Sequence, residues 1–158
     1  MFFNVLFPTH LLATATLGRV SRLSTPWLVA GAAVPDIIDK PLGVSGIVDL
    51  YHTVGHSVLF LVVIIPIALY SNSGRAVAVG WGSHVALDGV HVVVNGRAID
   101  LLSHGWPVTA PPGPPDIPSG SFFSHYLGSP SFLLEVVLWL LAGLTLLYNI
   151  RPDLDGES

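Results

Sequence analysis

One apolar stretch carries a histidine and a carboxylate at a spacing that suits a shared ligand. In "GSHVALDGVH", residues 82–91, His84 and Asp88 are four residues apart. On a helix this spacing places both side chains on one face, one turn apart. An intramembrane carboxylate costs at least about 2.5 kcal/mol, so we expect Asp88 to face the protein interior and to have a partner there. Imidazole and carboxylate groups bind zinc, manganese and iron, so the partner could be a metal ion.

Three other stretches offer further ligands. They are "FPTHLLA" with His10, "VPDIID" with Asp36 and Asp39, and "YHTVGHS", in which His52 and His56 are again four residues apart. We predict one or two divalent ions, zinc first and manganese or iron as alternatives. Asp36 or Asp88 could act as the general base if it is not fully engaged as a ligand. Asp39 is a ligand or a supporting residue. The predicted metal ligands are His10, Asp36, His52, His56, His84 and Asp88.

Each of these residues also has a purely structural interpretation. Asp36 follows Pro35 and could close a turn or cap a helix. A single histidine in an apolar segment, such as His10, is more often a hydrogen-bonded interior residue than a ligand. We assign His91 to a solvated position near the membrane interface. We assign structural roles to two more histidines, His104 and His125. The joint pattern favours the metal site, because independent structural residues need not converge.

The composition is that of an integral membrane protein. Hydrophobic residues make up 51% of the 158 positions and charged residues only 10%, against about 25% charged in an average soluble domain. We therefore expect one all-α domain over residues 1–158. The absence of cysteine excludes disulfides and thiolate chemistry. The six basic residues form no patch, so nucleic acid is not an expected partner.

The apolar stretches predict a multi-pass transmembrane helix bundle with four to five membrane segments. A span needs about 20 residues; the last three stretches come near this length, the first is marginal and the second, ending near Pro35, is short. Residues 95–131 are rich in proline and glycine and predict an extramembrane loop, and residues 151–158 form an acidic tail. The stretches are Phe2 to Leu17, Trp27 to Ile38, Val54 to Tyr70, Ala76 to Val94 and Phe132 to Ile150.

The basic residues predict an orientation. If all five stretches cross, one side carries Arg19, Arg22, Arg75 and Arg151. The other side carries Lys40 and Arg97. By the positive-inside rule, the arginine-rich side is cytoplasmic. We therefore predict a protein of the inner, cytoplasmic membrane whose site lies toward the extracytoplasmic face.

Four blocks, "PTH", "GAAVPDIID", "YHTVGHS" and "GWGSHVALD", follow one another between Pro8 and Asp88. Their order resembles that of the YdjM-like family of membrane-bound metal-dependent hydrolases, described as LexA-binding and inner membrane-associated. Two positions depart from the family pattern. Ile38 precedes Asp39 where the family has a shorter aspartate block, and Thr53 stands where an arginine usually follows the first histidine. The resemblance implies a membrane-bound hydrolase without naming its substrate.

We therefore expect a metal-dependent hydrolase that acts on a phosphoester or on another polar-headed lipid, because a site near the membrane surface reaches head groups. Two other functions use the same residues. A small transporter or a proton- or ion-conducting protein would line its pathway with them. A non-catalytic membrane assembly subunit would use them to hold its helices together.

Overall fold

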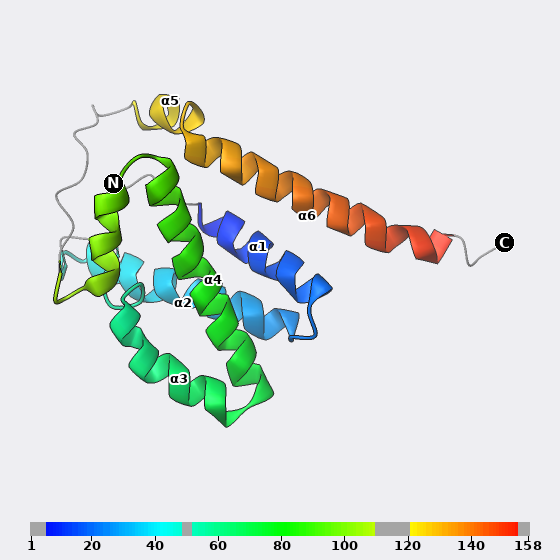
Figure 1. Ribbon diagram of the computed structural model, residues 1–158, viewed down its shortest axis with the longest axis horizontal. Coiled ribbons are helices and arrows are strands. Elements are labelled where there is room, and N and C mark those ends of the chain that lie inside the picture. Colours follow the sequence, from blue (N-terminus) through cyan, green and yellow to red (C-terminus); the bar gives the residue numbers. More distant parts are fainter. Residues whose placement is uncertain (1–5, 49–51, 110–120, 155–158) are drawn as a thin grey trace.

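The computed structural model describes residues 6–48, 52–109 and 121–154. Within them the chain is helical without strands, which confirms the all-α part of the predicted fold class. Figure 1 shows α1, α2 and α4 at the centre of the molecule and α6 leading away from it. The elements in chain order are α1 (Phe7–Val20), α2 (Thr25–Val44), η1 (Val58–Phe60), α3 (Leu61–Tyr70), α4 (Asn72–Val94), η2 (Ala98–Gly105), α5 (Phe122–Leu127) and α6 (Pro130–Leu154).

Helix α2 is longer than the sequence predicts. It runs for 20 residues and continues through Pro35, where we expected an end. A proline inside a helix loses one backbone hydrogen bond, and packing compensates for that loss here. Pro35 is buried, and the backbone of Gly55 lies so close that a Cβ on Gly55 would be 2.7 Å from the Pro35 carbonyl oxygen.

Helices α2 and α4 cross at two glycines. A Cβ on Gly31 would lie 2.1 Å from the carbonyl oxygen of Val77, and one on Gly80 would lie 2.0 Å from that of Leu28. Only glycine allows the two backbones to approach this closely. The crossing places His84, one turn beyond Gly80, against the backbone of α2.

Two described helices are long and apolar enough to cross a bilayer, judged by length and composition: α4, and α6 from Pro130 to Tyr148. The expected span from Val54 to Tyr70 is helical only over the three residues of η1 and the ten of α3. This is about 20 Å of helix, short of a bilayer core of about 30 Å. The four to five predicted membrane segments are therefore not confirmed, and the structure supports the coarser prediction of membrane association.

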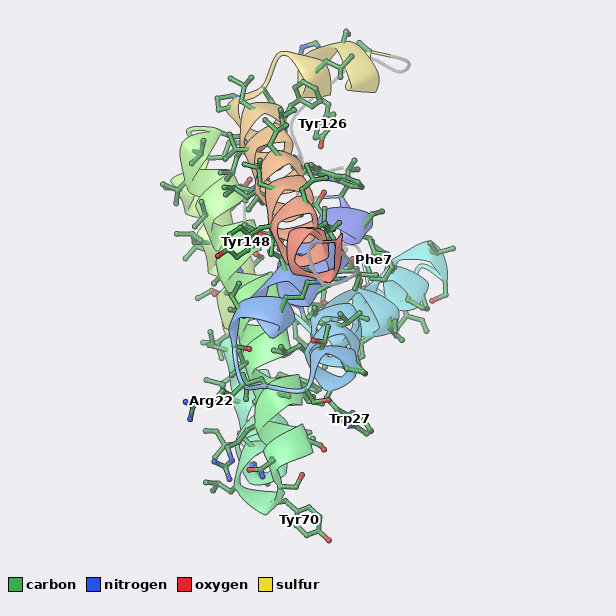
Figure 2. The ribbon with its side chains drawn as sticks, turned by 90° about the vertical axis from the view of Figure 1, so that its right-hand side faces the viewer. Phe7, Arg22, Trp27, Tyr70, Tyr126 and Tyr148 are labelled. Atoms are coloured by element: carbon green, nitrogen blue, oxygen red, sulfur yellow. The ribbon has the colours of Figure 1, made fainter. Side chains whose placement is uncertain are left out.

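The second half of α6 projects beyond the other helices (Figure 1). Its leucines are exposed, with Leu144 and Leu147 at 62% and 63% of their full accessible surface. Figure 2 shows Tyr126, which precedes α6, and Tyr70, which ends α3, at opposite ends of the molecule. The predicted loop 95–131 contains η2 and α5 near its two ends, while its middle, 110–120, lies outside the described residues. The predicted tail 151–158 begins inside α6, which ends at Leu154.

Candidate metal centre

The structure brings all six predicted ligands together. His10 comes from α1 and Asp36 from α2, while the other four come from the turn before η1 and from α4. Their ligand atoms form three overlapping groups, and within each group the atoms lie within 4.8 Å of one another. We call the six residues the His/Asp cluster. The groups are His10, His84 and Asp88; Asp36, His56 and His84; and His52, His56 and Asp88.

Asp88 lies at the centre of the His/Asp cluster. Its Oδ1 is 3.2 Å from Nε2 of His10, and its Oδ2 is 3.3 Å from Nε2 of both His56 and His84. His52 Nε2 is 3.8 Å from the same Oδ2. Both oxygens are buried, yet neither has a partner in hydrogen-bonding geometry within the part of the chain that the structure describes. Here the histidine nitrogens lie close to a carboxylate but form no hydrogen bonds with it. Ligand atoms around a bound metal ion have this arrangement.

Asp39 lies behind the His/Asp cluster and supports it. Its carboxylate accepts hydrogen bonds from the backbone amides of Thr53, Gly55 and His56, and from the Thr53 hydroxyl. It also accepts from Nδ1 of His56 at 2.7 Å, which directs Nε2 of that ring into the cluster. Of the two predicted roles for Asp39, the structure favours the supporting one.

The same hydrogen bonds explain why the turn at residues 52–57 is not helical. The sequence places His52 and His56 four residues apart, a helical spacing, but the backbone amides that a helix would use are bound to the carboxylate of Asp39. Trp81 on α4 holds the turn from the other side, because its indole Nε1 donates to the carbonyl of Gly55 at 2.8 Å. The two histidines therefore reach the cluster from a turn.

His84 is fixed by the backbone of α2. Its Nδ1 donates to the carbonyl of Ala32 at 2.6 Å, so Nε2 faces the cluster. Nε2 of His56 lies 3.1 Å from Nε2 of His84. Since a hydrogen bond between two ring nitrogens needs one proton, one of these rings must donate it when no metal is bound.

The pKa of His56 identifies the donor. Burial disfavours the charged ring, but the hydrogen bond to Asp39 and the neighbouring Asp88 outweigh it and raise the pKa of His56 to about 9. Burial, assisted by His56, lowers the pKa of His52 to about 3. At neutral pH the metal-free cluster therefore holds a protonated His56 and a neutral His52.

Lys40 lies at the edge of the cluster, a position that our sequence analysis did not assign to it. Its Nζ is 2.7 Å from Oδ2 of Asp36, while Oδ1 of Asp36 lies 3.9 Å from Nε2 of His56. The signal was present in the sequence, because Asp36 and Lys40 have the spacing of a helical ion pair.

The remaining histidines divide into two groups. His104 and His125 bond to backbone carbonyls within their own turns, in agreement with structural roles. His91, however, is fully buried, and neither ring nitrogen has a hydrogen-bond partner among the described residues. The expected solvated position for His91 is therefore wrong, because α6 packs against this end of α4.

A buried carboxylate outside the cluster, that of Glu135, fastens α6 to α1. It accepts from the amide of Leu6 at 3.0 Å and from the hydroxyl of Thr9 at 2.7 Å. Trp139 donates to the same hydroxyl at 3.0 Å. We call these four residues the α6 anchor. One of them, Thr9, directly precedes His10 in the chain.

Comparisons with family models, with curated proteins and with solved structures found no match to this chain. The resemblance to the YdjM-like family stays a prediction based on the four blocks between Pro8 and Asp88. A function for the protein must therefore be inferred from the geometry of its own residues.

Proposed function

We propose that the protein is a membrane-bound, metal-dependent hydrolase whose reaction centre is the His/Asp cluster. One observation carries the proposal: Asp88 is buried among four histidine nitrogens, and neither of its oxygens accepts a hydrogen bond from the described residues. Buried carboxylates with structural roles are hydrogen-bonded. Asp39, with five hydrogen bonds, meets that expectation beside it.

The ligand set fits a divalent transition metal. The four imidazoles and the carboxylate of Asp88 suit zinc, manganese or iron, and we propose zinc first. A bound ion would polarise the scissile group and make water a stronger nucleophile. Hydrogen bonds from the two supporting groups, Asp39 and the Ala32 carbonyl, orient His56 and His84 for binding.

Asp36 is the proposed general base. Its side chain is 8% exposed, more than the 4% of Asp88, and one of its oxygens faces the cluster. In hydrolysis of a phosphoester, the water oxygen bonds to phosphorus as the ester P–O bond breaks. Asp36 takes the proton from the water and returns one to the departing oxygen, so protons and charge balance. Lys40, bound to the other oxygen of Asp36, holds the carboxylate in place.

The proposed substrate is a phosphoester or another polar-headed lipid. The candidate spans α4 and α6 and the exposed leucines of α6 support a place in the bilayer, and the predicted orientation puts the site near the extracytoplasmic surface. The hydrogen bonds of Asp39 argue against a pure assembly role for the cluster, because residues that only hold helices together would be satisfied as Asp39 is.

The test is hydrolysis by purified protein in lipid nanodiscs. The substrates are phosphatidic acid, phosphatidylcholine and a soluble aryl phosphate diester. We expect at least one substrate to be cleaved, the cleavage to stop when a chelator removes the metal, and zinc or manganese to restore it. Asp36→Asn should bind metal but lose most of the rate, while Arg75→Met, which alters an exposed charge on α4, should keep it. A metal-loaded protein that cleaves no substrate and moves ions across vesicle membranes would support the transporter.

A further inference from the structure

The six side chains of the His/Asp cluster differ in their exposure. The side chains of His10, His56 and His84 are at most 1% exposed. Exposure rises to 8% at Asp36 and 15% at His52. We call these two residues, together with the adjacent Lys40, the mouth of the cluster. A group that approaches the cluster from outside meets these side chains first, because they are more exposed than the rest.

Lys40 is held at the mouth by two contacts. Its Nζ lies 2.7 Å from Oδ2 of Asp36 on the same helix and 4.9 Å from the ring centroid of Phe7, the first residue of α1. The second contact is a cation–π interaction. Phe7 lies three residues before His10, so Lys40 bridges the two helices that carry His10 and Asp36. Its side chain is still 49% exposed.

The ammonium group of Lys40 has donors to spare. An ammonium offers three N–H donors, and Asp36 takes one of them. The remaining donors can serve acceptors that arrive from outside. By contrast, Arg97 is engaged by Asp100 through two hydrogen bonds. Within the described residues, no other basic side chain forms an ion pair with the cluster.

When one divalent ion is bound, the charge of the centre makes Lys40 important for binding an anion. With neutral histidines, Asp36, Asp39 and Asp88 give three negative charges. One divalent ion without Lys40 would leave the centre negative, and it would repel a phosphate group. Lys40 brings the same centre to neutrality, and a second divalent ion would make it positive. Its effect is large because partly buried charges are poorly screened.

We propose that Lys40 binds the anionic oxygen of a phosphate group at the mouth and so selects phosphate-bearing substrates. This inference rests on the proposed hydrolase function and names its substrate chemistry. The phosphate could belong to a lipid head group or to a soluble phosphate ester, since both present the same oxygens. Lys40 is a binding residue that touches the substrate, whereas Phe7 positions it.

The experiment measures phosphate binding rather than turnover. The protein is loaded with zinc in a maltoside detergent, which carries no phosphate, and inorganic phosphate is titrated by calorimetry. Lys40→Met removes the charge and Lys40→Arg keeps it. Arg75→Met removes a charge from an exposed position elsewhere. Zinc content is determined for every variant. The titration is repeated with phosphatidic acid added to the same detergent, so that a bound lipid head group competes with free phosphate.

We expect Lys40→Met to weaken phosphate binding by about tenfold or more, the usual effect of losing a hydrogen bond to a charged group, with zinc content unchanged. Lys40→Arg should remain within about threefold of the wild type, and Arg75→Met should match it. If phosphatidic acid weakens phosphate binding in the wild type but not in Lys40→Met, the natural group is a lipid head group. Without such competition, it is a soluble phosphate ester.

Three results would overturn the inference. Lys40→Met could bind phosphate as the wild type does, or it could lose zinc in parallel with phosphate, which would mean that Lys40 acts only by supporting the metal site. The zinc-loaded wild type could also bind no phosphate. Each of these leaves the proposed metal centre standing, whereas a wild type that binds no zinc, manganese or iron removes both the proposed function and the inference.

Discussion

Two of the regions in which the protein buries carboxylates have opposite surroundings. In the α6 anchor, Glu135 accepts from the amide of Leu6 and the hydroxyl of Thr9. In the His/Asp cluster, Asp88 accepts no hydrogen bond from the described residues although four ring nitrogens surround it. The chain supplies donors where a buried charge only joins helices, and it supplies ligand atoms where we propose a metal. This difference separates structural polar groups from functional ones more clearly than burial does.

The two regions are neighbours in the chain, but we expect metal binding to depend on one and the position of α6 to depend on the other. Thr9 belongs to the α6 anchor and His10 to the cluster, so α1 connects the two. Beyond the anchor, α6 presents exposed leucines such as Leu144. Changes in the cluster should therefore affect metal binding, while changes in the anchor should affect how α6 is held.

The largest effect is expected for Asp88→Asn. The amide keeps the shape of the side chain but loses the charge that Asp88 contributes to two of the three metal-binding groups. Because changes in supporting residues already cost 10- to 100-fold, we expect zinc affinity to fall by more than about 100-fold. Competition with a fluorescent chelator measures it. Leu144→Ala, on the exposed face of α6, is the control. Wild-type zinc affinity in Asp88→Asn with a native circular dichroism spectrum would contradict the prediction.

A smaller loss is expected for Asp39→Asn. The substitution replaces an acceptor oxygen with a donor in a group that receives five hydrogen bonds from the turn. His56 should then be less well oriented, and zinc affinity should fall by about 10- to 100-fold. The same chelator competition checks it. A loss as large as that of Asp88→Asn would mean that Asp39 is itself a ligand.

The pH dependence of zinc binding should be set by His56. The pKa of His56 is raised to about 9, so below pH 9 an ion must displace the proton from Nε2 before it can bind there. Affinity should therefore rise with pH, by up to about tenfold per unit between pH 7 and 9, and level off above pH 9. The lowered pKa of His52, about 3, adds no competition in this range. Calorimetry in buffers of different ionisation enthalpy should show proton release, and a flat profile would exclude His56 as a ligand.

The smallest effect on metal binding is expected for Glu135→Gln. The amide weakens the hold on Leu6 and Thr9, so α6 should loosen while the cluster keeps its ligands. We expect zinc affinity to change by less than about threefold. Hydrogen exchange should increase at the start of α1 and in the first turns of α6. If zinc affinity drops as far as in Asp39→Asn, the two regions are not separable.

The sequence predicts those features of the site that depend on the geometry of a single helix. The spacing of His84 and Asp88 predicts a shared face because an α-helix repeats every 3.6 residues, and both side chains do reach the same cluster. The all-α fold followed from composition. His10, Asp36 and His56 could also be chosen as candidate ligands from the sequence, because polar side chains in apolar segments need partners.

The sequence does not predict local structure that depends on contacts between residues far apart in the chain. The turn at 52–57 depends on Asp39, 14 to 17 residues earlier in the chain. The passage of α2 through Pro35 depends on packing by Gly55. The burial of His91 depends on α6, which begins much further along the chain, at Pro130. None of these partners can be identified from a local pattern, because each arises from the way the helices pack.

The most direct measurement of the central claim is elemental analysis of the wild-type protein, purified in detergent without chelators or added metal. The account predicts at least one divalent transition-metal ion per chain and the loss of most of it in His84→Ala, which removes a member of two of the three ligand groups. Wild type and His84→Ala that are both folded and both free of metal would contradict the account, because Asp88 would then be a buried carboxylate that binds no ion.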